Sequence, residues 1–389
     1  QRRSVRPTSA VIARSKATSQ SQRFGSSSVS PTPTLWSSVW REFWREQLPL
    51  VSIVLLAAFA ASYVLYGFVP GSARAFPIAG IAVSVPHLIG MGFGTGYIMA
   101  LVGQASGTLS LSYAASVLQY NGLSLSPTSL LITCLNPLGA LLGFWRERQW
   151  NLDMALWLCI GAVLGAPLGP LVRVYFLSDP APFKAAIGVA LLVTAVQLAI
   201  EVTPWFLRRA GRQRAFKEKY DRARANGEGL RHFRIVTVER SFWHVRIGYW
   251  GEEVVLHTPA MLAIGFIVGI GGAALGIGGG FLLVPILAIG YGLPLYVIVA
   301  ASIPYVIVLS VAGLVAYLYT LPWLTSVSSA PDWGFGLFVA AGAILGAWLA
   351  AKTQRYIPET YLKPMLAAFT AVIGGLYIAN YFSPLRFGV

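Results

Sequence analysis

Residues 272–287 read GAALGIGGGFLLVPIL and lie within an apolar stretch of 33 residues, Thr258–Gly290. A membrane crossing takes about 20 residues, so this stretch is too long for one straight helix. Its glycines crowd ahead of a proline, at Gly276, Gly278, Gly279, Gly280 and Pro285. Because clustered glycines support a regular helix poorly, we expect one helix to end here and another to begin. The second helix would aim its free N–H groups and positive dipole end at the membrane midplane, an arrangement that binds anions.

The composition of the chain is that of a membrane protein. Of its 389 residues, 56% are hydrophobic and only 11% are charged, whereas soluble domains carry about 25% charged residues. Apolar stretches follow one another along the sequence: Leu48–Val69, Pro77–Leu101, Gly103–Tyr120, Pro127–Trp145, Asp153–Leu177, Pro182–Phe206, Thr258–Gly290, Pro294–Thr320, Trp333–Lys352 and Pro358–Phe382. None of them alternates as a transmembrane β-strand would. The sequence therefore predicts an all-α polytopic membrane protein.

The positive charge of the chain is concentrated in two segments. Lysine and arginine number 29 against 14 acidic residues, for a net charge of +15. Residues 1–46 carry eight of these basic residues and residues 208–246 carry twelve, which leaves nine for all the rest. Basic loops of membrane proteins stay on the cytoplasmic side. We therefore expect a multi-pass protein of the cell (inner) membrane with its N-terminus and central loop in the cytoplasm, and no nucleic-acid partner.

Two long portions of the sequence match each other in order. Gly103–Gly107 aligns with Gly276–Gly280, and Gly161–Gly165 aligns with Gly342–Gly346. Further matches pair Thr128-Ser129 with Ala301-Ser302, Ala140 with Gly313, Asp153 with Asp332, and Lys184 with Lys363. If each half has about five membrane segments, every basic loop stays inside. Five is odd, so the sequence predicts two inverted-topology repeats with Gly-broken helices, the layout of many secondary transporters.

We expect the chain to have five parts. They are a disordered basic tail at 1–46, an extra N-terminal transmembrane helix at 47–70, a first membrane repeat at 77–207, a basic cytoplasmic loop at 208–257, and a second membrane repeat at 258–383. The tail, rich in arginine and serine, reads equally well as a targeting segment. Within the loop, 208–224 has helical charge spacing, and 232–257 alternates like a small hairpin of strands.

The run at 272–287, together with the duplicated layout, resembles the sulfite exporter TauE/SafE family, also called the toluene-sulfonate uptake permease group. The resemblance covers most of Pro77–Phe382 and implies a permease or exporter for sulfite, organosulfonates or related sulfur-containing anions. The family's motif falls on Gly276, Gly278, Gly279, Gly280 and Pro285. The first half departs from this motif, because Gln104, Ala105 and Ser106 replace the Ile-Gly-Gly of the second half. This departure concerns the identity of the substrate more than the fold.

Neutral donors beside the broken helices are the candidates for substrate binding. In addition to the motif they are Gly103, Gln104, Ser106, Gly107, Thr108, Ser110, Thr128, Ser129 and Ser302. The alternative for any glycine is close packing between helices. We expect packing for the glycines that recur at four-residue spacing, Gly161, Gly165, Gly169, Gly342 and Gly346. For Gly276–Gly280 we favour a place in the transport pathway, because three consecutive glycines exceed what packing requires.

Ionisable groups inside a membrane are functional candidates by default. His87 lies near the middle of its expected span, where it would either carry a coupling proton or bond to a neighbouring backbone group. We expect Arg173 to snorkel to the interface rather than bind the anion. Other polar positions have structural explanations: helix N-caps at Asp153 and Asp332, interfacial anchors at Lys184 and Lys363, and a helix kink at Asn136-Pro137.

Three classes of function fit such a chain: a secondary transporter working by alternating access, a passive anion channel, and an intramembrane enzyme acting on lipid or peptide. The enzyme would need a catalytic motif, and the sequence contains neither His-Glu-x-x-His nor Gly-x-Ser-x-Gly. Cys134 and Cys159 have no metal-site spacing. We therefore expect a transporter without catalytic residues, metal or cofactor. Its partners would be a small anionic substrate, the lipid bilayer and a coupling proton or cation.

Overall fold

The computed structural model of the chain describes residues 40–41, 43–67, 74–101, 106–139, 152–203, 236–249, 252–291, 293, 295–353 and 359–382. The chain divides into two units, Gln1–Phe43 and Trp44–Val389. In the first unit the rings of Trp40 and Phe43 meet edge to face, with their centroids 5.7 Å apart. The second unit holds the apolar helices and both sheets. The helix expected at 208–224 lies outside the described residues.

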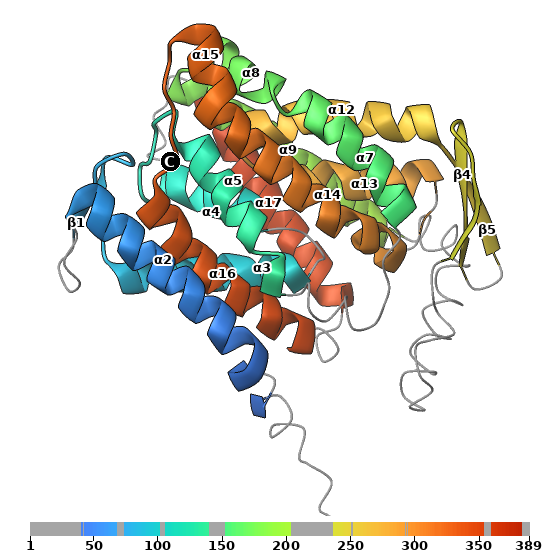
Figure 1. Ribbon diagram of the computed structural model, residues 1–389, viewed down its shortest axis with the longest axis horizontal. Helices are drawn as coiled ribbons and strands as arrows, with labels where there is room; N and C mark the ends of the chain where they lie inside the picture. Colours follow the sequence, from blue (N-terminus) through green and yellow to red (C-terminus); the bar gives the residue numbers. More distant parts are fainter. Residues whose placement is uncertain are drawn as a thin grey trace, which may run out of the picture. The chain divides into compact units, whose positions relative to one another are not determined.

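Helices form most of the described part of the second unit (Figure 1). The first half contains α2 (Leu48–Tyr66), α3 (Val85–Leu101), α4 (Gly107–Ser116), α5 (Leu125–Leu135), α7 (Leu152–Gly165), α8 (Leu168–Phe176) and α9 (Pro180–Val202). The second half contains α12 (Thr258–Leu275), α13 (Gly280–Tyr291), α14 (Leu295–Val315), α15 (Leu321–Thr325), α16 (Trp333–Thr353) and α17 (Glu359–Phe382). Two π-helical turns, η1 (Phe43–Gln47) and η3 (Ala316–Thr320), precede α2 and α15.

The lengths of these helices suit a membrane. Among the described residues, six helices are long and apolar enough to cross it, or seven if α7 and α8 count as one span bent by 44°. The prediction of an all-α polytopic membrane protein is confirmed. In both halves a long helix is followed by a short one after a small gap. α3 ends at Leu101 and α4 begins at Gly107, while α12 ends at Leu275 and α13 begins at Gly280.

Two helix pairs, α3 with α16 and α7 with α12, hold the halves together, and each pair joins a helix of one half to a helix of the other. Glycines let these backbones touch. A Cβ added at Gly92 or Gly96 of α3 would overlap the backbone of Val339 or Ala343 in α16. In return, a Cβ at Gly342 or Gly346 would overlap the backbone of Ile89 or Phe93. Close packing is thus confirmed for both α16 glycines.

The α7–α12 pair repeats this arrangement with residues from the other half. A Cβ at Gly161 or Gly165 of α7 would overlap the backbone of Leu262 or Phe266. A Cβ at Gly265 would overlap Leu158, and one at Gly269 would lie 3.1 Å from the Cα of Ala162. The packing prediction for Gly161 and Gly165 is confirmed, and Gly169 likewise meets Ala273 and Ala274.

The two sets of contacts correspond residue by residue. A shift of 173 positions takes Ile89 to Leu262 and Gly92 to Gly265 (89 + 173 = 262; 92 + 173 = 265). A shift of 181 positions takes Leu158 to Val339 (158 + 181 = 339), and the same shift takes Gly161 to Gly342. The contact of Gly92 with Val339 in the α3–α16 pair therefore corresponds to the contact of Gly265 with Leu158 in the α7–α12 pair. Exchanging the halves leaves this packing unchanged.

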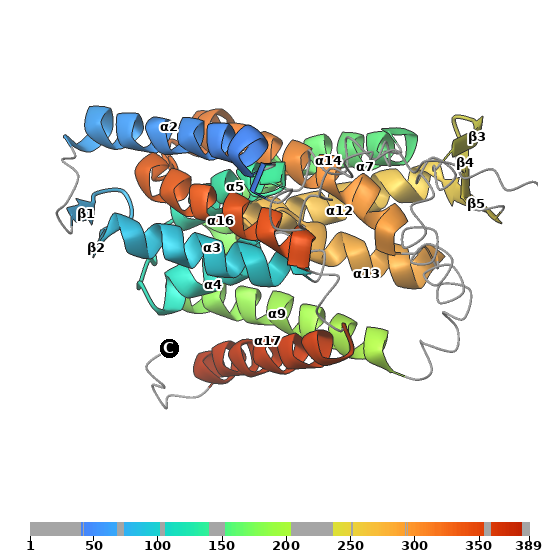
Figure 2. The same ribbon diagram turned by 90° about the horizontal axis from the view of Figure 1, so that it is seen from below.

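A third pair, α9 with α17, joins corresponding helices of the two halves, which lie side by side in Figure 2. Gly188 and Gly374 face each other, since a Cβ on either would come within 3 Å of the other's carbonyl oxygen. Lys184 and Lys363 each occupy the fifth position of their helix, which confirms their expected place near helix starts.

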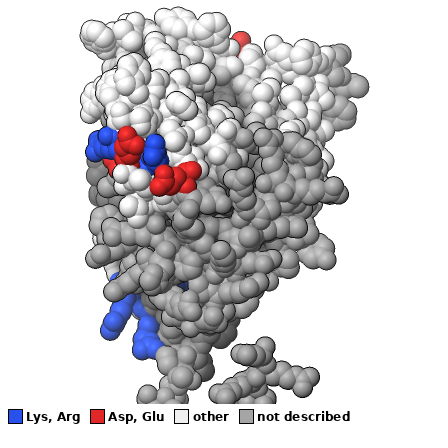
Figure 3. All heavy atoms as spheres, turned by 90° about the vertical axis from the view of Figure 1, so that its right-hand side faces the viewer, with Lys and Arg blue, Asp and Glu red and all other residues white. Residues whose placement is uncertain are grey.

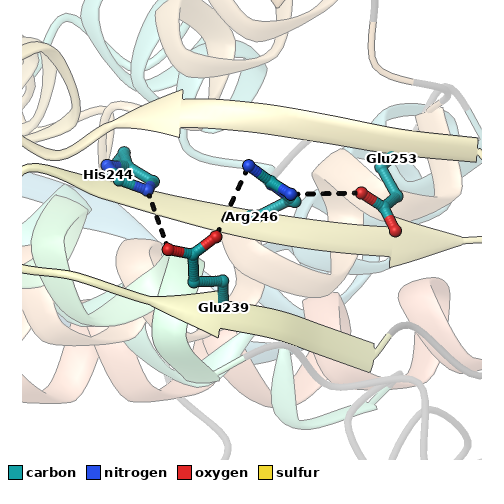
Figure 4. A network of polar contacts seen from close by, with 4 residues as sticks. All are labelled: Glu239, His244, Arg246 and Glu253. Carbon is teal, nitrogen blue, oxygen red and sulfur yellow. Dashed lines mark hydrogen bonds and ion pairs between the residues drawn. The ribbon is translucent and has the colours of Figure 1, made fainter.

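A three-stranded antiparallel sheet packs against α7, α12 and α13 (Figure 1). Its strands are β3 (Val236–Arg240), β4 (His244–Tyr249) and β5 (Glu252–His257), one more than the predicted hairpin. Val245, Ile247 and Leu256 are buried against the helices. Intervening charged residues face outward and pair across the strands, with Arg246 between Glu239 (3.4 Å) and Glu253 (3.7 Å) (Figure 4). Figure 3 shows acidic and basic side chains intermixed on this side of the molecule.

Asp153 ties this sheet to the helices. It is the second residue of α7, and not the N-cap that the sequence predicted. Its carboxylate accepts a 2.7 Å hydrogen bond from the Thr237 hydroxyl and pairs with Arg240 at 3.2 Å. The carboxylate is thus bound to a neighbouring strand, which explains why the capping prediction was wrong for this residue.

A second, two-stranded sheet lies at the opposite end from β3–β5 (Figures 1 and 2). Strands β1 (Arg74–Phe76) and β2 (Ile81–Val83) are antiparallel, and the Phe76 ring meets that of Phe335 edge to face. Asp332 precedes α16 at this end and is fully buried. Its carboxylate accepts from the N–H of Phe335 at 3.0 Å, which confirms the predicted N-cap, and from that of Ala79 at 3.1 Å. Burial raises the pKa of this carboxyl above its usual range, although these two bonds oppose the shift.

Candidate functional site

The break between α12 and α13 is made of residues in the left-handed conformation. Gly276 ends α12 with φ +80°, and its N–H donates to Gly272 O at 2.9 Å. Gly278 and Gly279 follow with φ +74° and +71° before α13 begins at Gly280. Side chains with a Cβ rarely adopt such angles, so the backbone itself requires glycine at these three positions.

The same glycines lie against α5. A Cβ at Gly276 would lie 2.8 Å from the Cα of Ser126, and one at Gly278 would overlap the Thr133 methyl group. A Cβ at Gly279 would instead meet Leu309 and Val268, at 2.8 and 2.9 Å. The break is therefore enclosed by α5 on one side and by α12 and α14 on the other.

The first half contributes its own break to the same place. Gly103 and Gln104 lie outside the described residues, while Ser106 and Gly107 are buried at the start of α4. The Cβ position of Gly107 overlaps the Thr133 hydroxyl and lies 3.2 Å from the carbonyl oxygen of Ile277. The two breaks thus meet, and Thr133 lies beside both of them.

Four polar residues of α5 and its C-cap form a stripe along these breaks, which we call the α5 polar stripe: Ser126, Ser129, Thr133 and Asn136. With 3.6 residues per turn they fall within about 80° of arc on the helix. All but Asn136 belong to the helix proper, and all four are buried. A polar stripe on a buried helix marks a face turned toward polar groups rather than lipid.

Each end of the α5 polar stripe binds one break. Ser126 donates to the Ala274 carbonyl at 3.0 Å, in the last turn of α12. With the Asn136 amide oriented so that each of its atoms meets a complementary partner, its oxygen accepts from the N–H and the hydroxyl of Ser106, at 2.9 and 3.1 Å, and its nitrogen donates to Ala343 O at 3.0 Å. Helix α5 ends at Leu135, so the predicted interruption at Asn136-Pro137 is confirmed.

Two hydroxyls near the middle of the stripe have no hydrogen-bond partner among the described residues. They are those of Ser129 and Ser310, and both are buried. Ser310, on α14, lies 3.2 Å from the Cβ position of Gly278. Buried polar groups without partners are uncommon in proteins and need an explanation. Here they supply free donors at the point where the breaks meet.

Several predicted site residues lie elsewhere. The Thr128 hydroxyl donates to Ser124 O at 2.6 Å and accepts from the Asp332 N–H at 2.9 Å, so it joins the cluster around β1–β2. Ser302 donates to Ile298 O within its own helix, and Ser110 bonds to Thr95. Thr108, Gly280 and Pro285 are buried within α4 and α13. Thr133 and Ser126 are central to the geometry, although neither is among the residues predicted for substrate binding.

His87 does not lie in the middle of a span. It is in the first turn of α3, which begins at Val85, and it is exposed. Its Nε2 is 3.0 Å from the Tyr113 hydroxyl, so its partner is a side chain and not a backbone group. The apolar stretch counted from Pro77 includes strand β2 and the turn before it, so the centre of the helix was expected too close to His87.

Arg173 does not snorkel to an interface. Its side chain is fully buried in α8, with the guanidinium 3.8 Å above the Phe183 ring. Nε donates to the Ser126 hydroxyl at 3.3 Å and Nη2 to the Gly122 carbonyl at 3.4 Å. These contacts keep the cation inside the protein, against the end of the α5 polar stripe.

Comparison with known proteins shows the family of the chain. The family model described as sulfite exporter TauE/SafE matches residues 88–377, a range that contains both helix breaks, the α5 polar stripe and Arg173. No curated protein and no solved structure matches the chain. The matched range covers most of the chain and nearly all of its apolar helices. This multi-pass membrane protein belongs to the sulfite exporter TauE/SafE family of membrane transporters.

Proposed function

We propose that the chain is a secondary transporter for sulfite, organosulfonates or related sulfur-containing anions, which pass between the two helix breaks. The observation that carries this proposal is the meeting of the breaks. Gly107 from the first half and Ile277–Gly279 from the second lie together beside Thr133. Broken helices that meet inside a membrane bundle are the usual substrate site of secondary transporters.

The donors at this point suit an oxyanion. The hydroxyls of Ser129 and Ser310 are buried without partners, and the N-termini of α4 and α13 begin at the breaks. Helix N-termini offer N–H groups and a positive dipole end, which stabilise an anion without a fixed charge. Gln104, which the sequence places in the first break, would add a neutral amide donor.

Alternating access requires two arrangements of similar energy. The exchange of contacts between the α3–α16 and α7–α12 pairs supports this step, because a two-fold relation between inverted halves would produce it. If each half adopts the other's conformation in turn, the site opens first to one side and then to the other. The glycine contacts then act as smooth surfaces along which helices slide.

Transport by purified protein in liposomes tests the proposal. We expect saturable uptake of labelled sulfite, and faster uptake when the liposomes are preloaded with unlabelled sulfite, since a carrier exchanges its substrate. Uptake that does not saturate and ignores preloading would indicate a passive channel. Absence of flux for sulfite and for a panel of organosulfonates, in protein shown to be inserted and folded, would refute the proposed function.

A further inference from the structure

Arg173 is a buried cation with no buried counter-ion among the residues that the structure describes. In the part of the chain that the structure describes, its contacts are the Ser126 hydroxyl, the Gly122 carbonyl and the Phe183 ring. None of them is a carboxylate, and Nη1 has no hydrogen-bond partner among the described residues. The side chain is fully buried. The positive charge is therefore held in the protein interior by neutral groups alone.

Such an arrangement is costly unless a negative charge joins it. Removing an ion from water costs several kcal/mol even after the protein relaxes. A buried charge without an oppositely charged partner does not recover this cost. The two hydrogen bonds of Arg173, at 3.3 and 3.4 Å, are longer than usual for a charged donor. The last turn of α8 and the face of Phe183 offer partial negative charge, which lowers the cost without cancelling it.

The location of this charge connects it to the helix breaks. Ser126, which accepts from Arg173, donates in turn to Ala274 O in the last turn of α12. The backbone of Ser126 also lies against Gly276. About one turn further along α5 is Ser129, whose buried hydroxyl has no partner among the described residues. Arg173 Nη1, on a side chain that bonds to Ser126, and Ser129 Oγ, about one turn further along α5, are thus two donors without partners among the described residues.

We propose that Arg173 is the residue that binds the charge of the transported anion, at the end of the α5 polar stripe nearest to Gly276. This inference rests on the proposed transport function and names the group that selects its substrate. A guanidinium presents paired N–H donors to two oxygens of one sulfonate or sulfite group. The site would therefore accept sulfur oxyanions and reject neutral analogues such as sulfones, which cannot compensate the buried charge.

A purely structural role for Arg173 predicts different behaviour. In that case its contacts with Phe183, Ser126 and Gly122 would hold α8 against α5, and substitution would lower stability without changing the affinity for anions. Arg173→Gln removes the charge and keeps part of the side-chain length. Arg173→Lys keeps the charge but loses the planar pair of donors. Arg240→Gln makes the same change on an arginine that is 58% exposed and outside the stripe, so it serves as the control.

The first experiment measures initial rates of sulfite uptake in proteoliposomes across a range of sulfite concentrations. For Arg173→Gln we expect KM to rise by about tenfold or more, the loss that follows removal of a charged hydrogen-bond donor. Arg173→Lys should lie between this variant and the wild type, and Arg240→Gln should match the wild type. An unchanged KM in Arg173→Gln, with wild-type transport intact, would overturn the inference and leave the proposed function standing.

A second measurement separates binding from transport. Sulfite and methanesulfonate should raise the melting temperature of detergent-solubilised wild type but not that of Arg173→Gln, while dimethyl sulfone should raise neither. This result without any flux in liposomes would support the site and refute transport. If Arg173→Gln does not fold, the lysine variant decides: a weaker anion-induced shift supports the site, and an unchanged shift contradicts it.

Discussion

Gly271 and Gly278 are seven residues apart and have opposite surroundings. Gly271 lies inside α12 with no atom within 4 Å of its Cβ position, whereas Gly278 has φ +74° and its Cβ position overlaps Thr133. Both residues are glycines with similar neighbours in the sequence. The difference between them is the backbone angle and the approach of α5, so only at Gly278 does the packing require the absence of a side chain.

We therefore predict that Gly278→Ala destabilises the protein and stops sulfite transport, while Gly271→Ala does neither. The left-handed angle alone costs roughly 1–2 kcal/mol for alanine, and the overlap adds roughly 1–3 kcal/mol. Combining Gly278→Ala with Thr133→Ser, which removes the opposing methyl group, should recover only the stability lost through the overlap. Melting temperatures in detergent and uptake in liposomes measure both effects. Equal behaviour of the two alanine variants would contradict this account of the break.

Asn136 joins three elements through one amide. Its oxygen receives the Ser106 N–H and hydroxyl at the start of α4, and its nitrogen reaches Ala343 O in α16. The aligned residue of the second half is Leu309 (136 + 173 = 309), which has no such groups. We predict that Asn136→Leu lowers the free energy of unfolding by roughly 1–3 kcal/mol, because the buried Ser106 N–H loses its acceptor.

Transport by Asn136→Leu should fall more steeply than its stability suggests, since the first break loses its support. Asn121→Leu makes the same chemical change on a half-buried loop residue and should leave both properties close to wild type. Wild-type uptake by Asn136→Leu would show that the first break does not need this amide.

Asp332 gives stability a pH dependence of definite sign. Burial raises its pKa in the folded protein above the ordinary value of 3.8. The folded state then binds this proton more tightly than the unfolded state, so stability is highest at acid pH and falls as pH rises through the folded pKa. We predict that the melting temperature of Asp332→Asn lacks this decline, although asparagine still caps α16.

The comparison requires melting curves of wild type and Asp332→Asn over a common pH series, so that all other titrating groups cancel in the difference. At acid pH the variant should be the less stable protein. An amide cannot accept from both the Phe335 and Ala79 N–H groups through two oxygens as the carboxyl does. A difference that does not vary with pH would refute a raised pKa.

At the scale of elements, α5 and α14 show how two aligned helices diverge. The residues of α14 that align with Ser126, Thr133 and Asn136 are Val299, Val306 and Leu309, so only α5 carries a polar stripe. Helix α14 instead contributes Ser310 and the apolar contacts to Gly279 and Gly280. The first half therefore supplies most side-chain donors, and the second half supplies the glycine backbone.

The paired helices make a prediction of symmetry. Gly92→Ala in α3 and Gly265→Ala in α12 should each lower the melting temperature, and by similar amounts, because each new methyl group meets a backbone carbonyl. Gly94→Ala, on the same helix as Gly92 but with no atom within 4 Å, should be neutral or slightly stabilising. A large effect at only one of the two packed positions would argue against equivalent interfaces in the two halves.

For the whole molecule, composition and repeated motifs were enough to predict the membrane fold, the Asp332 cap, and the packing role of Gly161 and Gly342. These features depend on the pattern of neighbouring residues or on the alignment of one half of the sequence with the other. The burial of Arg173 was not predictable, because it depends on the bend between α7 and α8 and on Phe183 from another helix. Snorkelling is the usual state of such an arginine, and tertiary contacts prevent it here.

Part of the candidate site was likewise predictable from the sequence, and part was not. The local sequence predicted the glycines of the second break. The place where the two breaks meet involves Thr133, which belongs to no motif. The spacing of Ser126, Ser129, Thr133 and Asn136 is a signal that sequence contains, since polar residues at helical spacing are unusual in an apolar segment. His87 was expected near the middle of its helix because residues of the preceding hairpin were counted as part of that helix.

The central claim is that the anion occupies the space beside the α5 polar stripe, and protection of a cysteine placed there tests it most directly. In a background with Cys134→Ala and Cys159→Ala, the Ser129→Cys variant would be treated with a small maleimide with and without methanesulfonate. Leu131→Cys, on the opposite face of α5, is the control. We predict that methanesulfonate at about four times its Kd slows labelling of Ser129→Cys about fivefold, since only the unoccupied fraction reacts. Equal labelling rates with and without the anion, or equal slowing at Leu131→Cys, would contradict the account.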